Sequence, residues 1–142
     1  MDDNTIIAKI VDILKNASPT IGLKDVLNTH PNQGDLTQYP IATVTPDSWQ
    51  DAYVTLRDTK RVLTVAIRIY NKLEGDDTDD DVQLKVRELR DKVLNIVEKN
   101  ITLDNIIDWT SPTQGKYLFA KTASDVYIAE IMMQVQYRFN RS

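Results

Sequence analysis

Apolar residues at helical spacing mark two long stretches of the chain, the first of them near its start. In residues 3–17 they recur in steps of three and four, which predicts an amphipathic helix with one stripe facing a core. Asn4 or Asp3 is expected to cap its N-terminus, because a short polar side chain can accept the unpaired backbone N–H groups of the first turn. The helix is expected to end at Ser18-Pro19, since the residue before a proline avoids helical backbone angles.

Residues 78–99 show the same periodicity and give the strongest helix prediction, with Asn100 as the C-terminal cap. Between the two helices, residues 21–27 carry apolar side chains that are compatible with a short helical turn. Residues 28–38 are polar and contain proline and glycine, which is typical of a loop. This loop exceeds the usual length of a connection, and long loops in compact domains often carry function.

Six further segments alternate apolar and polar residues or are rich in β-branched and aromatic residues, as strands are. Short turns such as Asp58-Thr59 and Pro112-Thr113-Gln114-Gly115 join them, so neighbouring strands should run antiparallel. The sequence therefore predicts an α+β fold, a mainly antiparallel β-sheet with two main helices packed on one face. The predicted strands cover residues 39–45, 53–57, 60–71, 105–111, 116–121 and 125–139.

The last predicted strand has two unlike sides. From Tyr127 to Phe139, every second residue is apolar, which predicts the side that faces the core. The other side begins apolar at Val126 and becomes polar further along. Ile128 and Met132 on that side fit either an exposed interface or burial beneath the first helix, and the sequence leaves both interpretations open.

Composition narrows the class of protein. A length of 142 residues fits one domain over residues 1–142. The formal net charge of −4 disfavours binding to nucleic acid or to anionic lipid, because both kinds of binding require clustered Lys and Arg. The absence of cysteine excludes disulfides, thiolate nucleophiles and cysteine metal sites. No signal peptide or membrane span is expected, so the chain should fold in a cytoplasm.

Four aromatic residues fit either a stacking platform for nucleic-acid bases or a protein core. A platform needs interleaved basic residues, and Lys116 and Lys121 alone lie near them in the sequence. Core packing is therefore the favoured interpretation. The four residues are Trp49, Trp109, Tyr117 and Phe119.

The run from Glu74 to Asp81 is strongly acidic and allows three interpretations. A calcium-binding loop would need glycine where Val82 stands, and the helical stripe already begins there. The acids would equally stabilise the N-terminus of the following helix through its dipole. A third interpretation is an acidic loop that faces a partner or a lumen. The calcium ligands would be Asp77, Asp79, Asp81 and Glu88.

Little in the chain supports catalysis. His30 is the only histidine, and its neighbours place it in a loop, so neither a hydrolytic triad nor a histidine-rich metal site can be built around it. The 4 glycines form no phosphate-binding run. Ser48 and Ser124 lack the context of a nucleophile elbow. We therefore predict no catalytic residue, no metal ligand and no cofactor.

The order and size of the predicted elements match a known pattern. Tyr39–Val44 provides a first strand and Arg61–Tyr70 a central strand, and an acidic turn then leads into the helix Leu84–Asn100. The chain finishes with a long strand that ends Tyr137-Arg138-Phe139. On these stretches, which cover nearly the whole chain, the sequence resembles a tail terminator, also called tail completion protein, of long-tailed bacteriophages.

This resemblance implies a structural virion protein and no enzyme. Such a subunit forms a ring, typically a hexamer, that caps the tail tube, ends its polymerisation and offers a joining surface on the head side. Its partners would be further copies of itself, the tail tube protein and the head-side connector protein, while DNA passes through without specific binding. The protein would be located in the virion tail after assembly in the host bacterial cytoplasm.

Two alternatives stay open. Another neck or head–tail joining protein, or the tail tube subunit, belongs to the same class, whereas a metal-binding enzyme using the 76–81 acidic cluster belongs to a different one. In a ring, we expect the sheet to face the lumen, the helices to lie outside, and the two polar loops to contact subunits or partners. The expected contact residues are His30, Asn32, Asp35, Glu74, Asp76, Asp77, Asp79 and Asp80.

Overall fold

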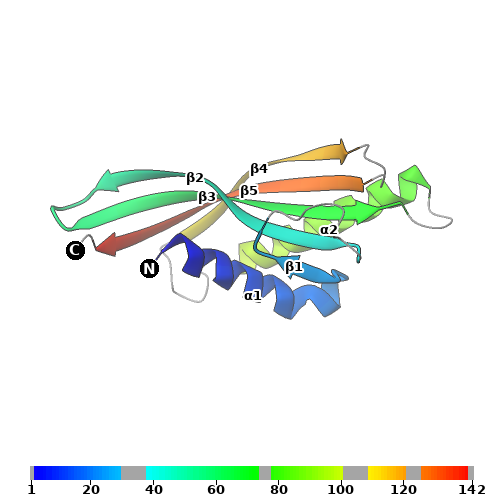
Figure 1. Cartoon of the computed structure of the whole chain (residues 1–142), viewed down its shortest axis with the longest axis horizontal. Helices are drawn as coiled ribbons and strands as arrows, with labels where there is room; N and C mark the ends of the chain where they lie inside the picture. Colours follow the sequence, from blue (N-terminus) through cyan, green and yellow to red (C-terminus); the bar gives the residue numbers. More distant parts are fainter. Residues whose placement is uncertain (1, 30–37, 74–77, 101–108, 121–125, 141–142) are drawn as a thin grey trace.

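The computed structural model describes residues 2–29, 38–73, 78–100, 109–120 and 126–140; for Asp79, residues 109–120 and Asn140 it describes the backbone alone. Two helices and five strands follow one another in the chain, as Figure 1 shows. In order, they are α1 (Asp3–Ile21), β1 (Asp25–Leu27), β2 (Ile41–Tyr53), β3 (Asp58–Lys72), α2 (Asp79–Lys99), β4 (Trp109–Ala120) and β5 (Val126–Asn140).

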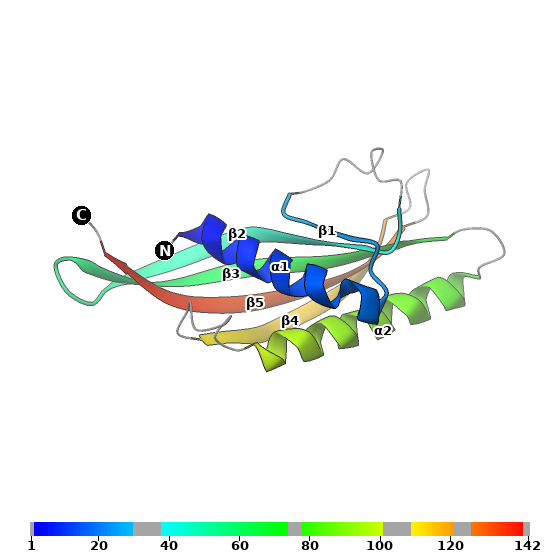
Figure 2. The same ribbon diagram turned by 90° about the horizontal axis from the view of Figure 1, so that it is seen from below.

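The strands form one twisted sheet in the order β1-β2-β3-β5-β4. Only the pair β1–β2 is parallel, and the other three pairs are antiparallel. Both helices lie against the same face of this sheet (Figure 2). The predicted α+β class, with two helices on one face of a mainly antiparallel sheet, is confirmed.

The main core lies between the helices and the sheet. Alternate residues of β3 and β5 point into it, since successive side chains of a strand face opposite sides. The stripe of α1 that the sequence predicted packs against them. The fully or almost fully buried residues include Ile6, Ile10 and Leu14 of α1, Leu63, Val65, Ile67 and Ile69 of β3, and Ile131, Met133 and Val135 of β5.

Both ends of α1 differ from the prediction. Asp2 is the N-cap, in place of Asn4 or Asp3, and its carboxylate accepts the backbone N–H of Thr5 at 2.8 Å. The helix continues through Pro19 to Ile21, whose side chain is buried in the core. Burial of Ile21 offsets the hydrogen bond that the proline removes.

Gly22 ends α1. Its φ of 92° lies in the left-handed region, which glycine adopts without steric cost, and its N–H donates to the Ser18 carbonyl at 2.8 Å.

The segment after α1 is a strand, so the predicted helical turn over residues 21–27 is wrong. Val26 and its neighbours pair with the start of β2, in the register Asp25↔Ile41 to Leu27↔Thr43. Three residues are too few to show either the helical or the strand period, and the pairing partner lies far away in the sequence.

Two strand boundaries were misplaced for a shared reason. β2 continues from the predicted strand 39–45 without a break to Tyr53. The predicted strand 53–57 is therefore wrong after Tyr53, since residues 54–57 form the turn, ahead of the expected Asp58-Thr59. The predicted turn at residues 112–115 likewise lies inside β4, while residues 105–108 and 121 fall outside the described part. In both strands the register shifts at a proline, between Pro46 and Ser48 and between Pro112 and Gln114. A β-bulge accepts a proline that would interrupt a regular ladder.

The second helix is confirmed with its predicted ends. Thr78 caps its N-terminus in a capping box: its hydroxyl accepts the Asp81 N–H at 3.2 Å, and the Asp81 carboxylate accepts the Thr78 N–H at 3.4 Å. Asn100 caps the C-terminus and donates from its side-chain amide to the Ile96 carbonyl at 2.8 Å. Residues from Asp79 to Glu88 are helical, so the calcium-loop interpretation of this stretch is wrong.

A smaller apolar cluster lies on the sheet face that the helices leave uncovered. Ile128 belongs to it, together with Ile41, Tyr70 and Val126. Ile128 is therefore buried, although not beneath α1, and neither of its two predicted environments is correct. Met132 on the same side of β5 is half-buried.

The capping box provides a direct test of the start of α2. Thr78→Ala removes the hydroxyl that accepts the Asp81 N–H, and we expect it to lower the free energy of unfolding by about 0.5–2 kcal/mol. Urea unfolding followed by circular dichroism measures this difference. Lys85→Ala, an exposed change in the same helix, should shift stability by less than about 0.5 kcal/mol. Equal effects of the two substitutions would contradict the capping role.

Candidate interaction surface

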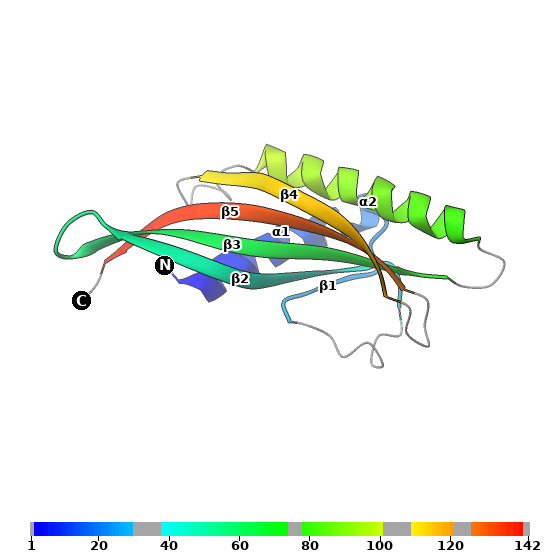
Figure 3. The ribbon, with the colours of Figure 1, turned by 90° about the horizontal axis from the view of Figure 1, so that it is seen from above.

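The β2–β3 hairpin extends beyond the helical layer (Figure 3). The first five residues of β2 are buried, whereas its last eight are exposed. The change occurs at Pro46, where the bulge lies. We call residues 46–62, which include the 54–57 turn, the hairpin arm.

Exposed apolar side chains gather on the arm. Of the large hydrophobic side chains that are exposed in the described part of the chain, all but Leu84 lie here: Trp49 is 64% exposed, Tyr53 76%, Val54 45% and Leu56 97%. An open hollow at the tip is lined by residues 53–56. Apolar groups that gather on a surface mark a site of interaction. The expectation that Trp49 packs in the core is wrong, because β2 continues past the helices that would cover it.

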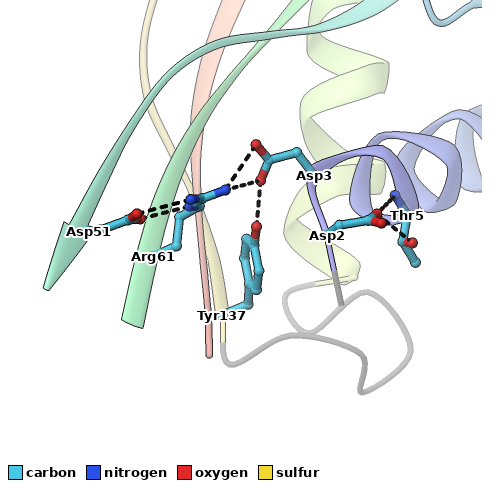
Figure 4. Close-up of polar contacts among 6 residues, drawn as sticks. All are labelled: Asp2, Asp3, Thr5, Asp51, Arg61 and Tyr137. Atoms are coloured by element: carbon cyan, nitrogen blue, oxygen red, sulfur yellow. Dashed lines mark hydrogen bonds and ion pairs between the residues drawn. The ribbon is translucent and has the colours of Figure 1, made fainter. Parts of the chain in front are cut away.

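A polar cluster of four residues, the Arg61 cluster, lies on the arm, two residue pairs before the β2–β3 ladder ends (Figure 4). The Arg61 guanidinium donates two hydrogen bonds to the Asp51 carboxylate, at 2.7 and 2.9 Å, across the β2–β3 pair. It also donates to both Asp3 oxygens at 3.3 Å. The Tyr137 hydroxyl of β5 donates to the same Asp3 carboxylate. The cluster thus joins the start of α1 to three strands.

Charge and stacking reinforce this cluster. The Arg61 guanidinium carbon lies 4.8 Å from the centre of the Phe139 ring and 5.8 Å from that of Trp49, within the range of cation–π contact. The hydrogen bond from Arg61 lowers the pKa of Asp51. The same bond raises the pKa of Arg61 above its usual range. Burial, followed by the hydrogen bond to Asp3, raises the pKa of Tyr137. Arg61 is therefore a fixed positive charge that orients the arm.

The outer edge of β2 offers a second surface. Among the described residues, β1 pairs only with Ile41–Thr43, and no strand pairs with the outer edge of β2 from Val44 to Tyr53. Pro46, Asp47 and Asp51 lie along this edge, and proline and charge are devices that limit unspecific pairing of open edges. The edge is open to a specific partner and protected against random aggregation.

A buried ion pair lies on the helix-free sheet face. Arg68 Nε and Glu130 Oε2 are 2.7 Å apart across the β3–β5 pair, and the Arg68 guanidinium also donates to the Thr45 hydroxyl at 3.3 Å. The side chain of Glu130 is 8% exposed, so this pair has a structural role within the sheet.

Most of the predicted contact residues lie outside the described part of the chain, namely His30, Asn32, Asp35, Glu74, Asp76 and Asp77. Asp79 begins α2, and Asp80 follows it as an exposed residue of the first turn. The hairpin arm was missed by the sequence analysis. Its signal was a series of large apolar residues, from Trp49 to Leu56, that follows Pro46 and is interspersed with polar residues.

The described residues contain no group of three or more His, Cys, Asp or Glu side chains placed to hold a metal ion. Neither α1 nor α2 is both long and apolar enough to cross a membrane.

Comparison with solved structures finds this fold in a chain of the virion of the native gene transfer agent (GTA) particle. The match has a TM-score of 0.70 at 11% sequence identity and covers 94% of each of the two chains. No protein-family model and no curated protein matches the sequence. The likeness shows a shared fold along almost the whole chain.

The Arg61 cluster predicts a pH dependence of stability. Because the pKa of Asp51 is lowered in the folded protein, its contribution is present above the unfolded value of about 3.9 and is lost as the pH falls through the lower folded value. Asp51→Asn should cost about 0.2–1 kcal/mol at pH 7, the range for an exposed ion pair, and almost nothing near pH 2.

Urea unfolding at the two pH values measures this difference. Asp47→Asn, an exposed change on the same strand, is the matched control and should cost less at pH 7. A cost of Asp51→Asn that does not depend on pH would refute the ion-pair contribution.

Proposed function

We propose that this chain is a structural virion protein of a long-tailed phage or a related particle, and specifically the tail terminator. Copies of the chain form a closed ring that caps the tail tube, stops its polymerisation and provides the joining surface for the head-side connector. The observation that carries this proposal is the fold shared with a virion chain over 94% of both chains. The resemblance in element order to tail terminators points in the same direction.

The exposed surfaces support a role in assembly. Exposed side chains such as Tyr53 and Leu56 add nothing to the stability of a chain that acts alone. In an interface between subunits, such side chains are buried at the centre. The open edge of β2 adds backbone groups that a neighbouring chain can pair. Ring formation needs contacts between two different patches, repeated until the rotation closes. The arm provides one of these patches.

The proposed role needs no catalytic residue, metal or cofactor. The ring lumen would let DNA pass without specific binding, since the net charge of −4 repels phosphate. We further propose that the polar loop, residues 28–38, and the acidic run from Glu74 to Asp81 contact other subunits, the tail tube protein or the connector protein.

Replacing Asp76, Asp77, Asp79 and Asp80 with Asn should spare folding and impair assembly.

Electron microscopy and light scattering of the purified chain test the proposal. We expect closed rings, formed alone or on the end of tubes made from the tail tube protein, and shorter tubes when the chain is present. Long cylinders of the chain itself would identify a tube subunit in place of a terminator. A chain that forms no ring and leaves tube growth unchanged would refute the proposal.

A variant of the arm makes this test specific. Leu56→Asp should abolish ring formation, because it places a carboxylate in the interface, and should leave the free energy of unfolding unchanged within about 0.5 kcal/mol, because Leu56 is 97% exposed. Lys15→Asp, which adds an acid on the exposed side of α1, is the control and should assemble normally. Rings formed by Leu56→Asp would exclude the arm from the subunit contact.

A further inference from the structure

Two exposed apolar surfaces lie at opposite ends of the described molecule. One is the hairpin arm, and the other is Leu84 of α2, which is 50% exposed. In Figure 1 the turn between β2 and β3 lies at one end of the long axis, and the N-terminal end of α2 lies towards the other. The two surfaces cannot meet within one chain.

Acidic residues flank Leu84 along one stripe of α2. Asp80 lies one turn before it and Glu88 one turn after it, and residues four apart are neighbours on the surface of a helix. Both acids are exposed, as are Asp81 and the cation Arg87, which lie three residues before and after Leu84. The core stripe of the helix contains Val82, Val86, Leu89 and Val93, so Leu84 takes no part in holding α2 on the sheet.

The tip of the arm has the complementary composition. Leu56 is followed by the exposed cation Arg57. The turn that carries them is ordered by its own hydrogen bonds: the Thr55 hydroxyl accepts the N–H groups of Arg57 and Asp58 at 3.2 and 3.0 Å, and the Val54 N–H donates to the Asp58 carbonyl at 3.0 Å. A turn that is already ordered loses little conformational entropy on binding.

We propose that the 54–57 turn of one copy docks on the stripe Asp80–Leu84–Glu88 of a second copy. Leu56 packs against Leu84, and Arg57 reaches a carboxylate beside it. Acids outnumber the one cation, Arg87, among the surface neighbours of Leu84, so the pairing is apolar at its centre and complementary in charge at its rim. This inference rests on the proposed self-assembly and names the contact by which it occurs.

The contact is head-to-tail. Each copy uses its arm towards one neighbour and its α2 stripe towards the other, so an open row of copies leaves one arm and one stripe unoccupied, at its two ends, until the ring closes. The Arg61 cluster holds the arm to α1 two residue pairs before the β2–β3 ladder ends, and thereby sets the direction in which the tip points. The rotation from one copy to the next follows from that direction.

Cysteine cross-linking tests the contact directly, because the chain contains no cysteine of its own. The double variant Leu56→Cys/Leu84→Cys, oxidised during assembly, should give a ladder of disulfide-linked multimers beyond the dimer, with 56–84 links identified by mass spectrometry. The single variants Leu56→Cys and Leu84→Cys are the matched controls and can link no further than a dimer. Linked dimers alone from the double variant would overturn the head-to-tail arrangement.

Charge reversal provides a second readout that a folding defect cannot imitate. Arg57→Glu should weaken self-association about tenfold or more, as should Asp80→Arg/Glu88→Arg, since each places like charges in contact. The triple variant Arg57→Glu/Asp80→Arg/Glu88→Arg should recover most of the loss. Failure of the triple variant to recover, with circular dichroism that shows a folded chain, would overturn the pairing.

The outcomes separate the contact from the function. Rings that form without 56–84 links would refute this contact and leave the terminator proposal standing. Absence of any ring, alone or on the tail tube, would refute both.

Discussion

The sheet of this protein is longer than the helical layer that covers it. With 15 residues, β3 spans about 50 Å at roughly 3.3 Å per residue. The two helices have 19 and 21 residues and span only about 29 and 32 Å at 1.5 Å per residue. Each helix is thus shorter than β3, and the turn between β2 and β3 lies beyond the start of α1 (Figure 3). The exposed aromatic and aliphatic residues of the hairpin arm gather towards that end of the sheet.

Two contacts hold the direction of the arm. Its β3 strand pairs with β5 as far as Asp58, and the Arg61 cluster ties it to α1. One guanidinium binds a carboxylate on the neighbouring strand and another on the first residue of α1, which stands 58 positions away in the sequence. Arginine suits this position because its planar group can bind two carboxylates and stack on rings at once. The contacts of Arg61 thus help to fix the direction in which the arm extends from the sheet.

The same architecture separates stability from assembly. The core between the helices and the sheet is formed by residues of a single chain. The surfaces proposed for assembly, the arm and the Leu84 stripe, contribute almost nothing to that core. Substitutions there should change association without unfolding the subunit, which makes the proposed ring and its head-to-tail contact accessible to experiment.

Periodicity along the chain was enough to determine both helices, the long strand β5, the buried side of each, and the α+β class. These features depend on residues close in the sequence: three or four apart in a helix and two apart in a strand. Of the interpretations that the sequence left open for the acidic run, the helix N-terminus holds for Asp79–Asp81, which form the first turn of α2. The parallel pairing of β1, the bulges that keep Pro46 and Pro112 inside strands, the exposure of Trp49 and the meeting of Asp3 with Arg61 were decided only by the tertiary structure. Each of them depends on which distant segment lies alongside and on where the helical layer stops, and no local pattern records either.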